Sequence, residues 1–340
     1  MTVETLTGAS AGTCAIALPG PIARQIDPST ATFHLVEMRI VPEYPTHPDP
    51  RHQPNPTGML WKFRDTRVDL THRAWVMGIL NVTPDSFSDG GLDAGPDAAA
   101  DRGLALLADG ADLLDIGGES TRPGASPVVE EEELRRILPV IRRLRSQTTR
   151  PISIDTRKSG VAQAALDAGA DIVNDISALR ADPAMADVVS RHRAGLILMH
   201  MQGTPESMQT DPSYADVTAE VLAFLRAQLR AATDAGIDPE CVALDPGIGF
   251  GKSTTHNLRL LHDLPQFAQP GRPVVLGVSR KSFLGRVLGI PDPTARLWPA
   301  VALAAFAVEK EARILRVHDV KETVDAVRMS EAIRDVPRMP

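Results

Sequence analysis

Residues 113–124 read LLDIGGESTRPG, and this stretch contains the unit from which most of the chain is built. Its first four residues, 113–116, form a short apolar run that contains one acidic residue, Asp115. A short apolar run without regular alternation is typical of a parallel strand that is buried on both faces. A glycine-rich polar turn follows directly, so polar groups lie at the carboxyl end of the predicted strand.

The same unit recurs along the chain after about residue 60. Ala- and Leu-rich stretches between the apolar runs predict helices at residues 97–111, 159–168, 214–235 and 299–309, and glycine follows several of them closely. Eight strands that alternate with helices predict an α/β fold of the (β/α)₈ barrel type, a TIM barrel, over residues 58–340. The eight apolar runs are residues 76–82, 113–116, 152–154, 172–176, 196–201, 242–244, 274–278 and 314–317.

An open doubly wound sheet is the alternative fold. In such a sheet, only strands near the switch point should carry polar groups at their carboxyl ends. In this chain every apolar run has a polar group at that end, which favours the closed barrel. These groups are Asn81, Asp115, Asp155, Asn174, Asp175, His200, Asp245, Arg280, Lys281, Arg316 and His318.

Composition limits the classes of function. The 340 residues include 36 basic and 43 acidic side chains, a net charge of −7, which provides no general attraction for nucleic acid or an anionic membrane. The two cysteines, Cys14 and Cys241, form neither a disulfide framework nor a metal-ligand pattern. No run reaches the length of a transmembrane helix, and no Lys or Arg precedes the apolar residues 14–19, so we expect a cytoplasmic protein.

Residues 1–57 form an N-terminal extension of different composition. Residues 42–56 read PEYPTHPDPRHQPNP, which is typical of an extended or disordered linker. We assign no function to this extension.

The polar groups at the predicted strand ends are of two chemical kinds. A single one of them would more often be a helix cap or a satisfied polar side chain, but a complete ring of them at a barrel mouth indicates a site. The cations Arg122, Arg280, Lys281, Arg316 and His318 suit a phosphate or diphosphate. Asp115, Asp155, Asn174, Asp175 and Asp245 suit a flat nitrogen heterocycle, because a buried carboxylate can accept two N–H donors from an aminopyrimidine edge.

Two further patterns are excluded as motifs. Residues 247–253, GIGFGKS, resemble the end of a nucleotide-binding P-loop, but Pro246 occupies the position of its first glycine. This segment is therefore interpreted as a tight glycine turn that lets a ligand approach the backbone. The histidines at positions 200, 256, 262 and 318 match no zinc signature, so no transition-metal site is predicted.

Eight segments together resemble the dihydropteroate synthases, in the order of that family. Residues 77–91, MGILNVTPDSFSDGG, and 114–124, LDIGGESTRPG, resemble its two signature segments. The resemblance covers about residues 60–335. The other segments are 153–158 (SIDTRK), 173–177 (VNDIS), 198–201 (LMHM), 244–252 (LDPGIGFGK), 279–285 (SRKSFLG) and 316–320 (RVHDV).

The resemblance implies a transferase of folate biosynthesis. The family condenses (7,8-dihydropterin-6-yl)methyl diphosphate with 4-aminobenzoate, which gives 7,8-dihydropteroate and diphosphate. It uses Mg²⁺, is commonly a homodimer, and is the target of sulfonamides, which mimic the aminobenzoate. Residues 297–299 and 309–311 are bulkier and more polar than expected for the family, which places the dimer surface in doubt.

The resemblance also implies roles for individual residues, by motif position. The pterin ring is held by Asp155, Asn174, Asp245 and Lys281, with Asp115 nearby. The diphosphate is held by Asn81, Arg316 and His318, and Asn81 is the metal ligand. The aminobenzoate pocket includes Phe87, Thr121, Arg122, Pro123, Phe250 and Ser282, beside loops 82–91 and 118–126. Asp115, Asp155, Lys281, Arg316 and His318 are the expected catalytic residues.

Two other functions remain open at this point. A pterin-dependent methyltransferase, which transfers a methyl group from methyltetrahydrofolate to a corrinoid protein, would share the barrel and the pterin-binding Asp and Asn residues. It would not need residues 120–123 or the diphosphate-binding Arg316 and His318. A non-catalytic pterin-binding paralogue should have lost the two loops, which are intact in this sequence.

Overall fold

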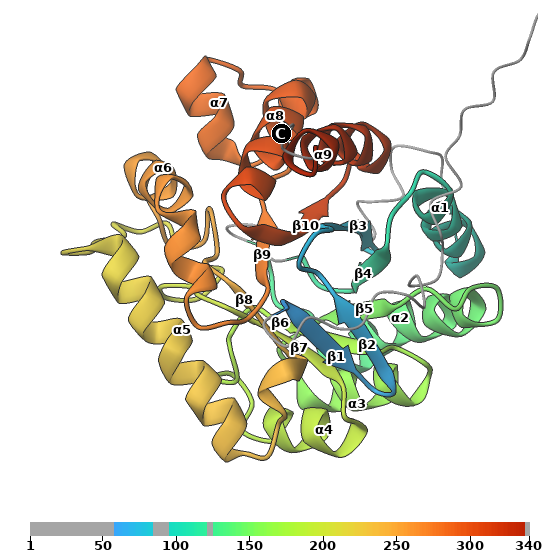
Figure 1. Cartoon of the computed structure of the whole chain (residues 1–340). Helices are drawn as coiled ribbons and strands as arrows, with labels where there is room; N and C mark the ends of the chain where they lie inside the picture. Colours follow the sequence, from blue (N-terminus) through green and yellow to red (C-terminus); the bar gives the residue numbers. More distant parts are fainter. Residues whose placement is uncertain (1–57, 84–94, 121–124, 337–340) are drawn as a thin grey trace, which may run out of the picture. The chain divides into compact units, whose positions relative to one another are not determined.

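The structure, a computed structural model, describes residues 58–83, 95–120 and 125–336, so the N-terminal extension lies outside the described residues. Eight parallel strands close into a barrel in the order β10-β3-β4-β5-β6-β7-β8-β9 (Figure 1). The predicted barrel is confirmed, and the open sheet is wrong. The barrel strands are β3 (Trp75–Asn81), β4 (Leu113–Gly117), β5 (Ile152–Asp155), β6 (Ile172–Asp175), β7 (Gly195–Met199), β8 (Val242–Asp245), β9 (Val274–Gly277) and β10 (Ala312–Val317).

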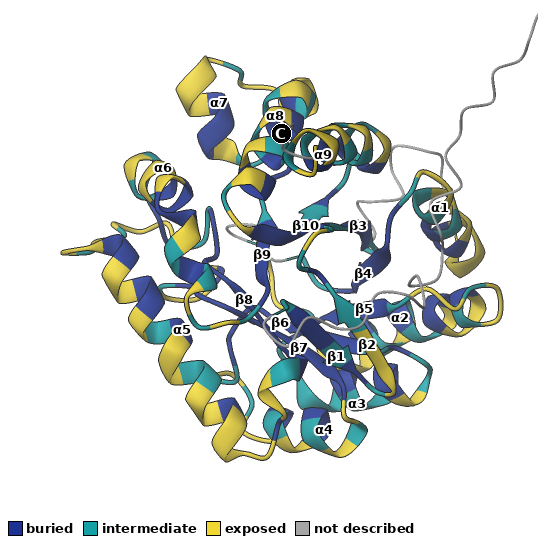
Figure 2. Ribbon diagram, viewed as in Figure 1, coloured by how far each residue is buried: buried dark blue, intermediate teal, exposed yellow. Residues whose placement is uncertain are grey.

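Helices surround the barrel, and their outward faces are exposed while the faces toward the strands are buried (Figure 2). The α-helices are α1 (Pro96–Ala108), α2 (Glu130–Arg145), α3 (Ser159–Asp167), α4 (Met185–His192), α5 (Val217–Asp234), α6 (Thr254–His262), α7 (Ser282–Leu288), α8 (Leu297–Glu309) and α9 (Val320–Arg334). Short 3₁₀ turns are η2 (Pro239–Cys241), η3 (Leu264–Ala268) and η4 (Thr294–Arg296). None of the described helices is both long and apolar enough to cross a membrane.

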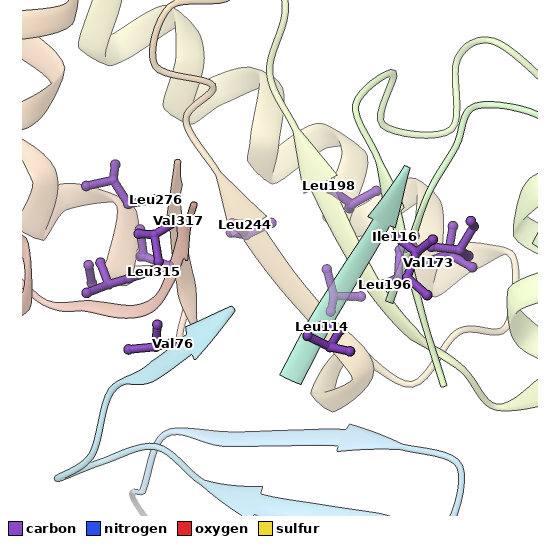
Figure 3. Close-up of a cluster of buried hydrophobic side chains, with 14 of the residues drawn as sticks. Val76, Leu114, Ile116, Val173, Leu196, Leu198, Leu244, Leu276, Leu315 and Val317 are labelled. Carbon is purple, nitrogen blue, oxygen red and sulfur yellow. The ribbon is translucent and has the colours of Figure 1, made fainter. Parts of the chain in front are cut away.

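The strand residues separate into two sets because successive side chains of a strand point to opposite faces. One set, which includes Val76, Leu114 and Leu196, packs outward against the helices in the large core cluster (Figure 3). The other set, which includes Leu113 and Ile172, belongs to a second, smaller cluster. Residues two positions further along the same strands therefore face the same side as this second cluster, at the carboxyl end of the barrel.

A β-hairpin that sequence reasoning missed supplies aromatic rings to this second cluster. It consists of β1 (Leu60–Phe63) and β2 (Thr66–Asp69), which pair antiparallel. Trp61 and Phe63 are buried, and each has its ring centroid within 6.3 Å of that of Trp75. The indole N–H of Trp61 donates to the carbonyl of Cys241 at 3.0 Å. The hairpin therefore fills the amino-terminal end of the barrel with apolar groups.

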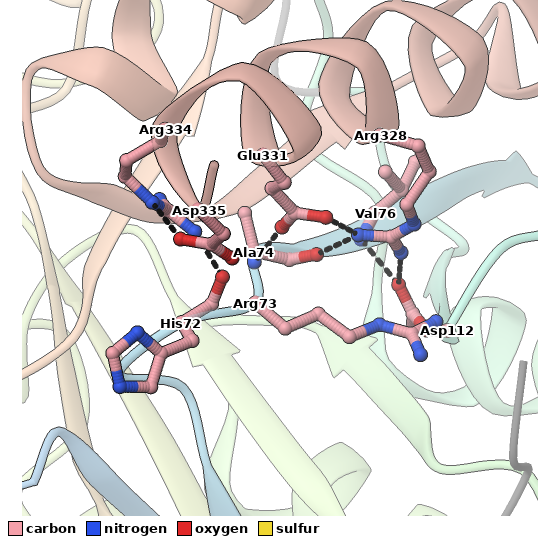
Figure 4. Close-up of polar contacts among 9 residues, drawn as sticks. All are labelled: His72, Arg73, Ala74, Val76, Asp112, Arg328, Glu331, Arg334 and Asp335. Atoms are coloured by element: carbon pink, nitrogen blue, oxygen red, sulfur yellow. Dashed lines mark hydrogen bonds and ion pairs between the residues drawn. The ribbon is translucent and has the colours of Figure 1, made fainter. Parts of the chain in front are cut away.

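A polar network joins α9 to the segment that leads into β3 (Figure 4). The buried carboxylate of Asp112 accepts from the backbone N–H of Val76 at 2.9 Å, from Arg73 at 2.9 Å and from Arg328 at 3.2 Å. Arg328 also donates to the Ala74 carbonyl at 2.9 Å. These bonds connect the last helix to the first barrel strand, where the barrel closes.

We predict that Asp112→Ala lowers the free energy of unfolding by about 3 kcal/mol, because it leaves two guanidinium groups and a backbone N–H without their buried acceptor. Urea unfolding measures the change. Asp325→Ala, on the exposed side of α9, is the control and should change the free energy by less than about 0.5 kcal/mol. Equal effects of the two variants would contradict this account of barrel closure.

Candidate active site

The two-residue period of the strands assembles the polar residues at the carboxyl end of the barrel. Asp115 follows Leu113 by two positions, Asn174 follows Ile172, and Arg316 follows Ile314. Strand register then sets neighbouring positions, since Gly117 pairs with Asp155, and Asp155 pairs with Asn174. The same geometry applies around the barrel, so residues as far apart in sequence as Asp115 and Arg316, 201 positions, meet there.

Arg316 connects two buried carboxylates. Its Nε lies 2.6 Å from Oδ2 of Asp115, and its Nη2 lies 2.8 Å from Oδ2 of Asp155. The Asn174 amide donates to the same Asp115 oxygen at 3.1 Å. Burial acts to lower the pKa of Arg316, but its attraction to Asp115 and Asp155 outweighs this and raises it. Arg316 therefore stays a cation at any physiological pH.

Burial shifts the ionisation of the other groups toward neutral pH. It raises the pKa of Asp155 to about 7, against the attraction of Arg316. Burial also raises the pKa of Asp245. The pKa of Lys281 is lowered by burial to about 8, although Asp245 opposes the shift. Groups whose pKa values are shifted toward the working pH are typical of functional sites.

Two buried carboxylate oxygens of this site have no hydrogen-bond partner within the described structure. They are Oδ1 of Asp115 and Oδ1 of Asp155. Buried acceptors are almost always satisfied in folded proteins, so an unpaired one requires an explanation such as a missing ligand. These oxygens are suited to accept N–H donors from a bound molecule.

A pocket contains most of the predicted ring-binding residues. Its polar lining comprises Asp155, Asn174, Asp245, Lys281 and Arg316, so the structure brings together the five residues on which the predicted site depends. Asp115 lies next to this set, through its bonds to Asn174 and Arg316. The rest of the lining is Ile176, Met199, Ile248, Phe250 and Gly277.

The apolar part of the lining was mostly missed from the sequence. Three of its members could have been found by the two-residue period, because Ile176 follows Asn174, Met199 follows Ile197, and Gly277 follows Val275. Phe250, which was predicted, comes from the loop after β8, and its ring centroid lies 4.0 Å from Nζ of Lys281. Apolar side chains beside carboxylates and amides make a pocket suited to a flat, polar-edged ring.

Besides Asp115, three described residues of the predicted site are not among the lining residues of this pocket. Oδ1 of Asn81 faces Gly117, since a Cβ placed on that glycine would lie 3.8 Å from it. His318 has its Nδ1 3.1 Å from the hydroxyl of Ser279. Ser282 is exposed at the start of α7. The other predicted residues, Phe87, Thr121, Arg122 and Pro123, lie outside the described residues.

Two polar groups expected at the mouth have other partners. The Asp175 carboxylate accepts from the backbone N–H groups of Ser177 and Leu179, so it stabilises a turn and does not line the pocket. Arg280 forms an ion pair with Asp319 at 2.5 Å, and its side chain is 39% exposed. Asp175 and Arg280 therefore do not line the pocket, whereas their neighbours Asn174 and Lys281 do.

Comparisons with known proteins agree with this geometry. The family model described as pterin binding enzyme matches residues 77–318. Dihydropteroate synthases from Synechocystis sp. and Escherichia coli are 44% and 45% identical over 79% and 78% of this chain, and over 93% and 94% of their own lengths.

Solved structures of the same family superpose on the barrel. A Xanthomonas albilineans dihydropteroate synthase with 4-aminobenzoic acid has a TM-score of 0.77 and 48% identity, over 82% of this chain and 100% of its own. The same enzyme in complex with 7,8-dihydropteroate has a TM-score of 0.74 and 45% identity, with the same coverage. A Yersinia pestis dihydropteroate synthase with a sulfonamide drug complex has a TM-score of 0.77 and 43% identity, again with the same coverage.

These relatives favour the synthase over the methyltransferase that the sequence left open. The relatives described above are named as synthases, and none of them is named as a methyltransferase. The family match spans well over half of the chain, and it includes every residue that the structure places around the pocket. The chain belongs to the pterin binding enzymes and, among them, to the dihydropteroate synthases.

Proposed function

We propose that the chain condenses (7,8-dihydropterin-6-yl)methyl diphosphate with 4-aminobenzoate in the pocket at the carboxyl end of the barrel. The observation that carries this proposal is the pair of unpaired buried oxygens on Asp115 and Asp155 beside the Arg316 cation. Relatives support the choice of substrates, since the Xanthomonas albilineans enzyme has been solved with 4-aminobenzoic acid and with 7,8-dihydropteroate.

The pterin ring would bind between the acidic residues and the apolar wall. One oxygen of Asp245 accepts from the Gly247 N–H at 2.7 Å, which leaves its other oxygen for the ring. Asn174 uses its NH₂ on Asp115, so its carbonyl oxygen remains as an acceptor. An aminopyrimidine edge offers several N–H donors, and these acceptors match them. Lys281 would donate to a ring oxygen or nitrogen.

The residues near Gly117 fit a magnesium ion that is held mainly by substrate. Mg²⁺ usually keeps several waters and phosphate oxygens and takes only one or two protein oxygens. The Asn81 amide oxygen faces the space above Gly117, which has no side chain to fill it. Asn81 would therefore be the protein ligand, and the bound ion would neutralise diphosphate charge. Arg316 and His318 would bind the diphosphate itself.

The chemistry follows from the distribution of charge. Loss of diphosphate leaves positive charge on the reacting carbon, and this charge spreads into the dihydropterin ring. Asp115, Asp155 and Asp245 supply negative potential for that cation in a buried environment. Loss of the leaving group would therefore precede attack, in an S_N1-like course. The aromatic amine is neutral at pH 7, so no general base need act before it attacks. When the C–N bond forms, the nitrogen releases one proton to water or to the departed diphosphate.

We also propose that the chain forms a homodimer through one exposed apolar patch. This patch, on α8 and α9 and just beyond, consists of Trp298, Phe306, Met329, Ile333 and Val336, each more than 40% exposed. Large apolar side chains exposed on two neighbouring helices are typical of interaction surfaces, and aromatic residues are enriched in interfaces. Trp298, whose bulk placed the dimer surface in doubt, is therefore compatible with a buried position in a dimer.

The synthase activity has a direct test. We expect diphosphate release to require both the pterin diphosphate and 4-aminobenzoate, and no corrinoid protein. Asn174→Ala should weaken the binding of 6-hydroxymethylpterin by about tenfold or more in calorimetry, because it removes one acceptor and one of the two donors to Asp115.

Arg280→Ala is the matched control for that variant. Its guanidinium pairs with Asp319 outside the pocket, so pterin affinity should change by less than about twofold. Unchanged pterin affinity in Asn174→Ala would refute the ring-binding role, and diphosphate release without 4-aminobenzoate would refute the proposed reaction.

The shifted ionisations predict a bell-shaped pH profile of kcat/KM. The rate should rise with pH as Asp155 loses its proton near pH 7, and fall as Lys281 loses its proton near pH 8. The residual activity of Asp155→Asn should lack the acidic limb and keep the basic limb. An acidic limb that is unchanged in this variant would assign it to another group.

The dimer is tested by light scattering after size-exclusion chromatography. The wild-type chain should elute as a dimer, and the double variant Trp298→Glu/Ile333→Glu should elute as a monomer, because buried unpaired carboxylates are costly. Val129→Glu adds a charge at an exposed position away from the patch and should remain a dimer. A monomeric wild type at micromolar concentration would overturn this proposal.

A further inference from the structure

Lys252 is a fully buried lysine that the proposed reaction does not use. It is 1% exposed, and within the described residues it forms no ion pair. Its Nζ donates to three neutral acceptors, which are Nδ1 of His200 at 3.0 Å, the His200 carbonyl at 3.3 Å and the Phe250 carbonyl at 2.9 Å. Burial lowers the pKa of Lys252 to about 7, although the attraction of Asp245 opposes the shift. Burial of a charge without a paired carboxylate is costly, so this arrangement calls for a functional explanation.

His200 is suited to accept the lysine hydrogen bond. Because the ammonium donates to Nδ1, the imidazole is neutral and its other nitrogen carries the proton. Burial, together with the positive charges of Lys252 and Arg180, lowers the pKa of His200 to about 3. The ring is fixed edge-on against Phe224, with centroids 4.9 Å apart. His200 therefore serves as a rigid acceptor.

Lys252 connects two backbone segments that are in close contact. Gly247 has a φ of +67°, and a Cβ at this position would lie 1.9 Å from the His200 carbonyl oxygen. Gly251 has a φ of +64°, and its Cβ would lie 2.6 Å from the Gln202 carbonyl oxygen. Only glycine allows the loop after β8 to approach the end of β7 so closely.

Other side chains hold the rest of this loop. The Gly249 N–H donates to Asn257 at 2.7 Å, and the Gly249 carbonyl accepts from Gln209 at 2.8 Å. The Gly251 carbonyl accepts from the Tyr214 hydroxyl at 2.8 Å. Lys252 holds the one carbonyl between them, that of Phe250, whose ring lines the pocket.

We propose that Lys252 is a positioning residue for the aromatic wall of the active site, an inference that rests on the proposed function. Its ammonium, held by His200, fixes the Phe250 carbonyl and thereby the Phe250 ring beside Lys281. Lys252 is not among the lining residues of the pocket, so it acts through Phe250 and does not touch substrate. The carboxylates proposed to bind pterin are on strands and, within the described residues, form no hydrogen bond with Lys252, although Asp245 and Lys252 attract each other.

Lys252→Met tests this inference, because it keeps the length and apolar stem of the side chain and removes its three donors. We expect the KM for 4-aminobenzoate to rise about tenfold, the loss of one well-placed contact, with kcat changed by less than about threefold. The affinity for 6-hydroxymethylpterin should stay within about threefold of the wild type.

A double-variant cycle separates positioning from a general loss of structure. Phe250→Leu should raise the same KM, and Lys252→Met added to it should raise the KM little further, because both changes remove the same ring placement. Additive effects of the two substitutions would overturn the proposal, as would an unchanged KM in Lys252→Met.

Substitutions of His200 provide a second route if Lys252→Met does not fold. His200→Asn keeps an acceptor near the position of Nδ1 and should retain a nearly normal KM, whereas His200→Leu should reproduce Lys252→Met. Equal KM values for these two variants would contradict the proposal. Val221→Ala, in the core between α5 and the barrel, is the control for lost stability and should leave the KM unchanged.

Activity of the wild-type chain distinguishes failure of the proposed reaction from failure of the positioning role of Lys252. If the wild-type chain released no diphosphate and bound no 6-hydroxymethylpterin, the proposed reaction would be refuted whatever Lys252 does. If the wild type were active but its KM for 4-aminobenzoate did not respond to Lys252→Met, only the positioning role would be refuted.

Discussion

The active site depends on one buried group of charges, Arg316 between Asp115 and Asp155. Two carboxylates in this environment would repel each other and take up protons, and the guanidinium offsets that repulsion with bonds of 2.6 and 2.8 Å. It uses one oxygen of each carboxylate and leaves the other unpaired. The three residues come from β4, β5 and β10, so only the closed barrel brings them together. Negative potential is thereby kept at the point where a carbocation would form, with a permanent cation beside it for the departing diphosphate.

The barrel shields Arg316, Asp115 and Asp155 from water on one side, because the same strands form an apolar layer below them. Inward-facing positions are apolar in the first half of a strand, as at Leu113 and Ile314, and polar two residues later, at Asp115 and Arg316. The β1–β2 hairpin adds Trp61 and Phe63 to the apolar layer. Water is therefore excluded from one side of the charges, which accounts for the raised pKa of Asp155 and the lowered pKa of Lys281.

The barrel could be predicted from the sequence because its strands are local apolar runs, and the ring of polar residues follows from where those runs end. The two-residue period limits this reasoning at single positions. Asp175 adjoins Asn174 but caps a turn, and Arg280 adjoins Lys281 but pairs with Asp319, and no sequence pattern distinguishes such neighbours. The hairpin was missed because its four-residue strands are stabilised by distant partners, such as the bond from Trp61 to Cys241. Lys252 belongs to a failed nucleotide motif and to the segment 244–252, and neither pattern assigns it a role, since its acceptors on His200 lie in another segment.

The two halves of the site therefore differ in what holds them. The residues proposed to bind pterin are mostly on strands, where the register that pairs Asp155 with Asn174 sets their positions, and moving one would disturb the whole barrel. Phe250 is on a loop in which its own N–H donates to the Gly247 carbonyl at 3.1 Å, and the other backbone bonds go to single side chains, from Lys252, Gln209, Tyr214 and Asn257. Substitution of one of these four side chains could shift the Phe250 ring slightly and leave the strands in place. The aromatic wall is thus the part of the site at which a substitution can alter the fit of a second aromatic ring while the residues proposed to bind pterin stay in place.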